Sequence, residues 1–317
     1  MKETDFSINK TDIALGEHKQ VKISVGKLPS GNRININASV FRSDKPGPVV
    51  LLLAGMHGDE IDGVEIVRQF LRNFAPASLK SGSLIVIPLL NIYGFLNFSR
   101  DVPDGKDVNR SFPGSRFGSL ASRVASSLTT EILPLTDVIL DFHTGGLGRY
   151  NFPQIRYTSG DDRSLELARV FNPPFIISKP TIAKSLRKIA RKGNKSILVY
   201  EGGEAQRRDE FVINMGLRGI YRILDYLEMV EYRDDKEYPL LQLSGSIWRR
   251  AAQSGFFIPQ KKSGDPVKNG EVIGLIQDLL EPKEYEVKST RNGFVIGNSY
   301  SPIVYQGDAL YHIGYLD

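Results

Sequence analysis

The sequence predicts an α/β protein, with a mixed sheet flanked by helices and a smaller all-β domain at the C-terminal end. Two apolar runs, Val49–Leu53 and Ser83–Leu90, are typical of strands that are covered on both faces. Between them, Asp62–Leu71 has the apolar spacing of an amphipathic helix. After residue 240 the pattern changes to short strands and glycine turns, which are typical of small all-β domains.

The N-terminal part is expected to supply the antiparallel edge that makes the sheet mixed. Val21–Val25 and Ile34–Val40 alternate apolar and polar residues, and the turn Pro29–Asn32 separates them. We therefore expect two antiparallel strands here. His18 is expected in the loop before this pair, exposed to solvent.

The end of the first buried strand carries the first candidate site. Gly55 and Gly58 allow a sharp turn, and His57 and Glu60 lie in that turn, three residues apart. Open α/β sheets bind ligands at the carboxyl ends of their strands, and an imidazole and a carboxylate are both zinc ligands. The alternative is a polar turn with a solvated histidine, followed by a glutamate that stabilises the start of a helix.

A loop rich in Asp, Asn and Arg follows the second buried strand. Pro103–Gly114 is the densest part of this loop. A long polar loop directly after a strand is a favourable place for a substrate pocket, because binding residues are often carried by loops on a rigid scaffold. The next segment, Leu120–Leu133, has helical spacing.

A third strand, Asp137–Gly146, ends in another glycine turn and carries His143. Asp141 lies two residues before His143, so both side chains face the same side of the strand. A carboxylate beside a metal-binding imidazole commonly fixes the tautomer and orientation of the ring. A hydrogen-bonded core histidine is the alternative. Because the chain has only four histidines, finding two of them at equivalent strand ends favours the metal site.

A fourth strand is predicted at Ser196–Gly203, where Glu201 precedes two glycines. Taken alone, Glu201 is expected to be a surface carboxylate at a strand end. It becomes a candidate for the site because its strand is the third that ends in a glycine turn presenting His or Glu. Helical spacing predicts helices near Ser164–Phe171, at Lys184–Lys192 and at residues 211–230.

The charged segment 231–239 ends at a proline and is the expected linker between two domains. It divides the chain into a domain at residues 1–235 and a small β-barrel-like domain at residues 240–317. His312 lies among apolar neighbours in the second domain, and we expect it to be structural.

Composition narrows the classes of function. The chain has 317 residues and a formal net charge of +5, with basic and acidic residues intermixed. It has no cysteine, so disulfides and thiolate metal sites are excluded. No nucleic-acid-binding signature appears, and no apolar run approaches the length of a membrane span. The N-terminus lacks the apolar core of a signal peptide, which makes a cytoplasmic protein the default expectation.

Four motifs occur in order along the chain, and together they carry a family resemblance: Met56–Glu60, Asp107–Gly114, Asp141–Gly146 and Glu201–Gly203. They resemble the succinylglutamate desuccinylase/aspartoacylase family, whose members are relatives of the zinc carboxypeptidases. The resemblance implies a zinc carboxypeptidase-like fold. Pro266–Glu271 and Gly293 are similar to the lipoyl-like pattern of the family's β domain, so the resemblance covers most of the chain.

The resemblance also implies a metal centre and a base. One Zn²⁺ per chain would bind to His57, Glu60 and His143, with an open position as catalytic zinc requires. Glu201 would act as general base towards the zinc-bound water and then as general acid towards the leaving amine.

The remaining implied roles belong to the pocket. Asn109 and Arg110 would line it, and Arg110 would polarise the scissile carbonyl or bind a substrate carboxylate. Arg100 matches a family arginine that binds a substrate carboxylate, and Arg187 matches the basic stretch before the strand of the catalytic glutamate. An ordinary surface ion pair is the alternative for Arg100 and Arg187.

The implied activity is zinc-dependent hydrolysis of the amide bond in an N-acylated amino acid or a related small amide. The alternatives are a zinc carboxypeptidase that acts on short peptides and a non-catalytic homologue that binds small molecules. We expect a small-molecule N-acyl amino acid-like substrate, with no nucleic-acid or membrane partner, and a homo-oligomer is compatible with the sequence. The β domain is expected to cap the cleft and narrow the choice of substrate.

Overall fold

The computed structural model describes residues 6–27, 31–234 and 236–316 of the chain. Its strands are β1 (Ser7–Ile8), β2 (Thr11–Asp12), β3 (His18–Lys27), β4 (Arg33–Arg42), β5 (Val49–Ala54), β6 (Ser83–Ile87), β7 (Val138–Gly145), β8 (Arg149–Thr158), β9 (Phe175–Lys179), β10 (Ser196–Glu204), β11 (Leu241–Leu243), β12 (Gly245–Arg250), β13 (Gly255–Pro259), β14 (Pro266–Val267), β15 (Val272–Gln277), β16 (Glu284–Lys288), β17 (Gly293–Ser299), β18 (Ile303–Val304) and β19 (Ala309–Tyr315). Its α-helices are α1 (Ile61–Asn73), α2 (Ile92–Leu96), α3 (Leu120–Ser127), α4 (Asp162–Phe171), α5 (Leu186–Lys192) and α6 (Glu210–Tyr226). Short 3₁₀ or π segments are η1 (Pro76–Ser78), η2 (Val108–Arg110), η3 (Leu128–Ile132) and η4 (Leu133–Leu135).

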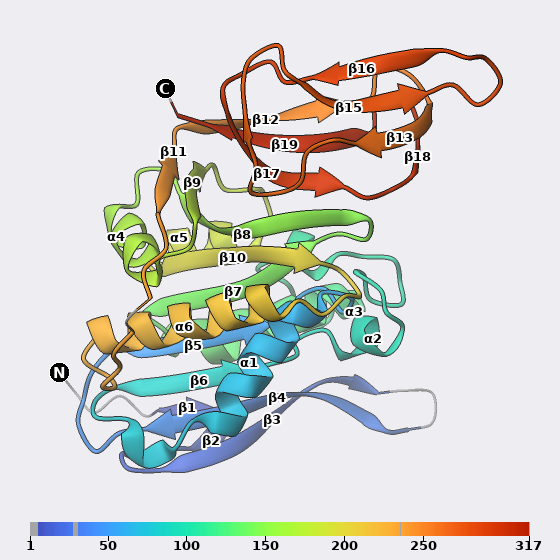
Figure 1. Ribbon diagram of the computed structural model, residues 1–317. Helices are drawn as coiled ribbons and strands as arrows, with labels where there is room; N and C mark the ends of the chain where they lie inside the picture. The colour runs from blue at the N-terminus through green and yellow to red at the C-terminus, as the bar shows by residue number, and fades with distance from the viewer. Residues whose placement is uncertain (1–5, 28–30, 235, 317) are drawn as a thin grey trace.

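The main sheet is mixed, as predicted. Along its longest path the order is β12-β19-β17-β8-β10-β7-β5-β6-β4-β3. The four central strands β10, β7, β5 and β6 run parallel, whereas β4 and β3 add an antiparallel edge. Figure 1 shows this path from the N-terminal strands at the bottom to the C-terminal strands at the top.

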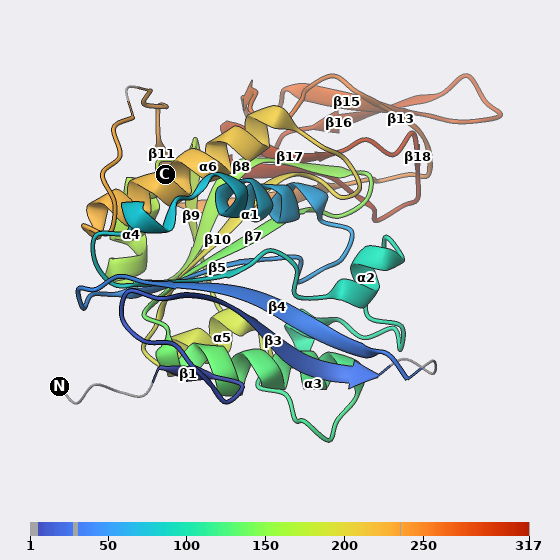
Figure 2. The ribbon, with the colours of Figure 1, turned by 90° about the horizontal axis from the view of Figure 1, so that it is seen from below.

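Helices cover both faces of the parallel centre. Along β5 the side chains alternate between two cores, with Leu51 and Leu53 in one and Val50 and Leu52 in the other. Residues of α3 and α5 pack in the first core, and residues of α1, α4 and α6 pack in the second. Figure 2 shows the two groups of helices on opposite sides of the sheet. This double coverage explains why the central strands are continuous apolar runs.

The predicted elements are largely present, with shifted ends. The segment 120–133 contains α3, a π turn and the start of a 3₁₀ turn, instead of one continuous helix. The helix predicted at 211–230 ends at Tyr226, because Glu228 has a φ of +56°, outside the helical region. His18 is exposed as predicted, but its predicted place in a loop is wrong: it is the first residue of β3 and stacks on Phe41 with ring centroids 4.0 Å apart.

Part of the N-terminal and linker predictions falls outside the described residues. The residues outside the described ranges include 1–5, Pro29 and Ser30 of the predicted turn, and Asp235 at the predicted end of the first domain. Within the described ranges, no helix is both long and apolar enough to cross a membrane.

The strands after residue 240 have a core of their own, yet they also extend the main sheet. A second sheet, β16-β15-β13-β18, packs with β17 and β19 around residues such as Phe257, Ile276 and Tyr311. At the same time β17 pairs with β8 through Gly297 and Asn151, and β11 pairs with β9. The division into domains 1–235 and 240–317 stays a prediction, and backbone hydrogen bonds cross the predicted boundary.

Candidate functional site

Three adjacent parallel strands bring the predicted site residues together. In the sheet β7 lies between β5 and β10, and all three run in the same direction. Glu201 on β10 is paired in register with His143 on β7. His57 and Glu60 follow the end of β5, so residues from three separate parts of the sequence meet at one edge of the sheet.

The turn after β5 aims its side chains into the protein. Gly55 has a φ of +63°, in the left-handed region that favours glycine. A Cβ on Gly58 would lie 1.9 Å from the carbonyl carbon of Gly94, so only glycine fits there. Glu60 directly precedes α1, but its side chain makes no capping hydrogen bond to that helix. His57 is only 2% exposed, which rules out the alternative of a solvated histidine.

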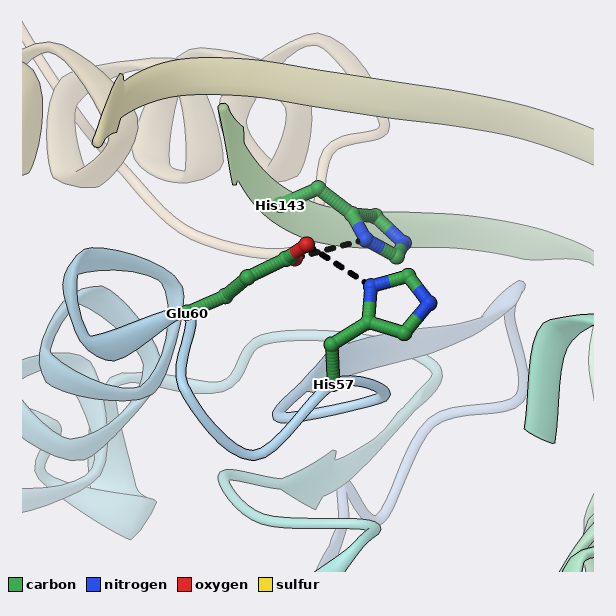
Figure 3. A group of neighbouring side chains, drawn as sticks. All are labelled: His57, Glu60 and His143. Atoms are coloured by element: carbon green, nitrogen blue, oxygen red, sulfur yellow. Dashed lines mark hydrogen bonds and ion pairs between the residues drawn. The ribbon is translucent and has the colours of Figure 1, made fainter. Parts of the chain in front are cut away.

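The side chains of His57, Glu60 and His143 point toward one another, as Figure 3 shows. Nδ1 of His57 lies 2.7 Å from Oε1 of Glu60, and Nδ1 of His143 lies 2.8 Å from Oε2 of the same carboxylate. The three residues are buried, and each offers a ligand atom within 4.8 Å of the other two. Among the described residues this is the group of His, Asp and Glu that could hold a metal ion.

The electrostatics of this group also suit a cation. Burial raises the pKa of Glu60, but the two imidazoles outweigh burial and hold that pKa far below its usual range. Burial lowers the pKa of His143, yet Asp141 and Glu60 raise it well above the usual value. The carboxylates around the two rings thus favour positive charge there, and a divalent cation would supply that charge.

Each histidine is held from behind by a carboxylate. Oδ2 of Asp141 lies 2.9 Å from Nε2 of His143, and Oδ1 of Asp107 lies 3.2 Å from Nε2 of His57. Both rings are therefore oriented so that Nδ1 faces Glu60. Asp141 was singled out from the sequence. Asp107 was not, although it belongs to the Asp107–Gly114 motif, because its contact with His57 spans 50 residues of chain.

The residue types and their orientation fit zinc. Two imidazole nitrogens and one carboxylate are a ligand set of catalytic zinc sites, in which a further position stays open. Carboxylates behind the two rings are the outer partners that such sites commonly have. Nδ1 of each ring faces the carboxylate of Glu60, so the candidate ligand atoms of the three residues lie together.

A cavity of about 270 Å³ opens beside this group. All the predicted site residues line it, as do several that the sequence did not indicate. The predicted ones are His57, Glu60, Arg100, Asn109, Arg110, Asp141, His143, Arg187 and Glu201, and the others include Arg149, Asn151, Arg156, Ile182 and Trp248.

The loop after β6 forms one wall of the cavity. Nη2 of Arg100 donates a hydrogen bond of 3.0 Å to Asp107, and its Nη1 lies 3.5 Å from Glu60. Asn109 accepts a hydrogen bond of 2.9 Å from the backbone N–H of Leu186, which ties the loop to the start of α5. Arg110 is exposed, and Nη1 of its side chain donates to the backbone oxygen of Asn109.

Glu201 has a partner for each of its carboxylate oxygens. Arg156 donates to Oε1 at 2.9 Å, and Nδ2 of Asn151 donates to Oε2 at 2.9 Å. Both partners come from β8, a strand that the sequence did not predict. Its sequence contains Pro153 and several polar residues, so it lacks the apolar run that reveals the other central strands.

Positive charge accumulates near Glu201. Within the described part of the chain, Arg187 donates only to the backbone oxygens of Tyr157 and Pro180, at 3.3 and 2.7 Å. Burial and then the charge of Arg156 lower the pKa of Arg187 to about 10. Burial, Arg156 and Arg187 also lower the pKa of Lys179, whose ammonium group hydrogen-bonds to Oγ of Ser246.

The C-terminal strands contribute a wall as well. Trp248 on β12 lines the cavity and is stacked on His312 of β19, with ring centroids 4.3 Å apart and planes 5° apart. His312 is buried, and its Nε2 lies 2.7 Å from Oγ of Ser246. Burial, followed by the charges of Arg156 and Lys179, lowers the pKa of His312 well below its usual value, so the ring is neutral. Its position in a packed sheet agrees with the structural role predicted for it.

Comparison with known proteins shows which family this chain matches. The family model described as the succinylglutamate desuccinylase/aspartoacylase catalytic domain matches residues 46–227. An N-alpha-acetyl-L-2,4-diaminobutyric acid deacetylase of Halomonas elongata is 28% identical over 281 residues, which cover 83% of this chain and 81% of that protein.

Solved structures share the fold over nearly the whole chain. A succinylglutamate desuccinylase/aspartoacylase from Rhodobacter sphaeroides has a TM-score of 0.85 and 24% identity, with 96% of this chain and 98% of that chain covered. The product-bound ectoine utilization protein EutE (DoeB) from Ruegeria pomeroyi has a TM-score of 0.84 and 20% identity, covering 96% and 97%. A succinylglutamate desuccinylase from Silicibacter has a TM-score of 0.86 and 21% identity, with both chains fully covered. The match includes the C-terminal strands as well as the central sheet.

Proposed function

The chain belongs to the succinylglutamate desuccinylase/aspartoacylase family, and on that premise we propose that it is a zinc-dependent deacylase of N-acylated amino acids or related small amides. The observation that carries the proposal is the buried group of His57, Glu60 and His143 beside a cavity that Glu201 also lines. The deacetylase of Halomonas elongata, which acts on an N-acetylated amino acid by its name, supports the reaction class.

In this proposal His57, Glu60 and His143 hold one zinc ion per chain. Zinc bound there supplies a Lewis acid, which lowers the pKa of a water molecule and polarises an amide carbonyl. Asp107 and Asp141 would keep Nδ1 of each ring turned toward Glu60, through their contacts with the two Nε2 atoms.

Glu201 moves the protons. Its carboxylate takes a proton from the water that attacks the acyl carbon, and later gives it to the amine nitrogen when the carbon–nitrogen bond breaks. The net products are a carboxylic acid and a free amine. Arg156 and Asn151 hold the two carboxylate oxygens, so the Glu201 side chain has a fixed direction before substrate arrives.

The arginines of the cavity bind and orient the substrate. Arg110 is exposed, carries no carboxylate partner among the described residues and is free to turn toward the oxygen of the scissile carbonyl. A donor at that oxygen typically contributes about 2.7–4 kcal/mol to transition-state stabilisation. Arg100, Asn109 and Arg187 are proposed to bind the carboxylate of the amino acid, for which the guanidinium fork is well suited.

The test is metal-dependent hydrolysis by the full chain. Metal-free protein is titrated with zinc, its zinc content is measured, and hydrolysis is assayed with N-acetyl and N-succinyl amino acids and with dipeptides. We expect about one zinc per chain and zinc-dependent release of the free amino acid from an N-acyl substrate. Faster cleavage of dipeptides would support the carboxypeptidase alternative. Zinc or ligand binding with no turnover of any substrate would support the non-catalytic alternative.

A further inference from the structure

A second cavity, of about 490 Å³, lies outside the catalytic one. Residues between Lys106 and Ser115, together with Ser122 and Lys184, line it, and we call it the outer pocket. Its two sides are joined by a hydrogen bond of 3.1 Å from the backbone N–H of Phe112 to the oxygen of Lys184. The neighbouring helices α3 and α5 lie on the same side of the sheet (Figure 2). Ligand pockets typically measure roughly 300–1,000 Å³, so the outer pocket has room for a small molecule.

Three cationic side chains line the outer pocket, and all three are exposed: Lys106, Arg110 and Lys184. The ion pair of Lys106 among the described residues is with Asp104, at 3.8 Å, and an exposed pair of this kind contributes little. Arg110 donates to a backbone oxygen, and neither Arg110 nor Lys184 forms an ion pair with a described carboxylate. The positive charge of this pocket is therefore largely unpaired.

One carboxylate, that of Asp107, also lines the outer pocket, but its oxygens are already engaged. Oδ2 accepts a hydrogen bond of 3.0 Å from Arg100, which balances the charge of Asp107. Oδ1 accepts a hydrogen bond of 2.6 Å from the backbone N–H of Asn109 and lies 3.2 Å from Nε2 of His57. The three cations of the pocket are thus left for an anion from outside the protein.

Two serine hydroxyls add hydrogen-bond donors to the outer pocket. Oγ of Ser122 accepts a hydrogen bond of 2.9 Å from the backbone N–H of Ser115, and Oγ of Ser115 accepts one of 3.3 Å from the N–H of Phe117. Because both oxygens are acceptors in these contacts, each hydroxyl hydrogen can be donated to a ligand. The loop lies close against α3 at Gly114, where φ is +82° and a Cβ would lie 2.2 Å from the backbone oxygen of Ser122. This close approach holds the two serines together.

We propose that the outer pocket binds a doubly charged oxyanion, either inorganic phosphate or the phosphate group of a small monoester. Lys106, Arg110 and Lys184 supply its positive charge, and Ser115 and Ser122 donate hydrogen bonds to its oxygens. Lysine binds a phosphate group as a point charge, whereas the arginine fork donates two parallel hydrogen bonds to it. The volume of the pocket leaves space for the organic part of a monoester.

Arg110 links the outer pocket to the catalytic cavity, because it lines both. A guanidinium that binds an anion in the outer pocket is withdrawn from the oxygen of the scissile carbonyl. The bound anion therefore lowers the rate of hydrolysis. This consequence rests on the role of Arg110 in the proposed function, whereas binding of the anion does not.

Calorimetric titration of the full zinc-loaded chain with inorganic phosphate tests the binding. The titration is made at about pH 8, where phosphate is doubly charged, and chloride keeps the ionic strength constant. We expect a phosphate site whose affinity falls about tenfold in Lys184→Gln and in Lys106→Gln, the effect of one charged hydrogen bond. Lys188→Gln, at an exposed position on α5, is the matched control and should bind phosphate as the unaltered protein does.

A second titration, with ribose 5-phosphate, distinguishes the two sources of the oxyanion. Tighter binding of ribose 5-phosphate than of phosphate would identify a monoester as the ligand, and the reverse order would identify the free ion. Both lysines are exposed, so neither variant is expected to disturb folding. Equal affinities in both variants and the unaltered protein would place the anion elsewhere, for instance at the zinc, and would overturn the proposal.

Steady-state kinetics test the link through Arg110. Phosphate should lower kcat of the unaltered enzyme, and Lys184→Gln should need about tenfold more phosphate for the same effect. Arg110→Gln should itself bind phosphate more weakly in calorimetry. Phosphate that only raises KM, to the same extent in Lys184→Gln, would show competition within the catalytic cavity and contradict the link. Phosphate binding that depends on Lys184, in a protein that hydrolyses no substrate, would support the outer pocket and count against the proposed function.

Discussion

Two groups of charged residues lie beside one cavity and differ in the kind of charged side chain that predominates. Around the two histidines, carboxylates predominate: Glu60 lies between the rings, and Asp107 and Asp141 lie behind them. Around Glu201, cations predominate, with Arg156 and Arg187 facing the cavity. We expect the kind of ligand that each group binds to follow from this difference in charge. The first group is suited to a metal cation and the second to a substrate anion.

The largest expected effect comes from removing a proposed metal ligand. In His143→Ala the group keeps two of its three ligand atoms, so we expect zinc to be lost on dialysis and hydrolysis to fall below detection. Zinc content by atomic spectroscopy is the measurement. His18→Ala, at an exposed histidine on β3, is the matched control and should keep one zinc per chain. A His143→Ala protein that retains stoichiometric zinc would refute the ligand set.

The next effect concerns the proton-transfer role of Glu201. Glu201→Gln keeps the size of the side chain but removes its basicity, so kcat should fall by about 10²–10⁴-fold with zinc content unchanged. Glu210→Gln, at an exposed position on α6, should leave kcat as in the unaltered enzyme. Full activity in Glu201→Gln would show that another group handles the proton.

A smaller effect is expected from the carboxylates behind the rings. Asp141→Asn and Asp107→Asn keep the shape of the side chain but remove the charge that orients each imidazole. Each should weaken zinc binding by about 10–100-fold, measured by competition with a chelator. Asp104→Asn, in the same loop as Asp107, is the control, because the ion pair of Asp104 among the described residues is with Lys106, at 3.8 Å. Unchanged zinc affinity in both variants would mean that zinc binding does not depend on the carboxylates that orient the two imidazole rings.

The smallest effect concerns the protonation of His312, which the charges of Arg156 and Lys179 disfavour, and it is measured as protein stability. Because the folded protein keeps His312 neutral, the unfolded chain binds a proton below about pH 6.5 that the folded chain does not. Stability should therefore fall as the pH drops below that value, by at most about 1.4 kcal/mol per pH unit from this residue. His312→Gln should reduce this dependence in urea denaturation between pH 7.5 and 5. An identical pH dependence in the variant would contradict the depressed pKa.

The residues of the candidate metal site could be predicted because local patterns mark them. His57, Glu60, His143 and Glu201 follow apolar runs that end in glycine turns, and parallel neighbouring strands necessarily bring such ends together. The fold class was confirmed for the same reason.

The cationic group could not be predicted, because its members come together only through long-range pairing. Arg156 lies on β8, which has no apolar run, and it meets Glu201 across 45 residues of chain. Trp248 lies on β12. It reaches the cavity because β17 pairs with β8, β19 pairs with β17, and β12 comes next in the sheet. No local signal near Trp248 indicates that pairing. Asp107 was visible within a motif, but only the folded chain shows that it contacts His57.

The pairing of β8 with β17 also limits how this protein can be divided. A chain cut after residue 240 would leave the backbone groups of β8 that now pair with Gly297–Ser299 without partners, and such open edges favour aggregation. Low activity of such a fragment would then report misassembly as much as altered substrate choice. Chimeras with relatives should therefore take β8 and β17 from the same parent, because these two strands must keep their backbone pairing at Gly297–Ser299.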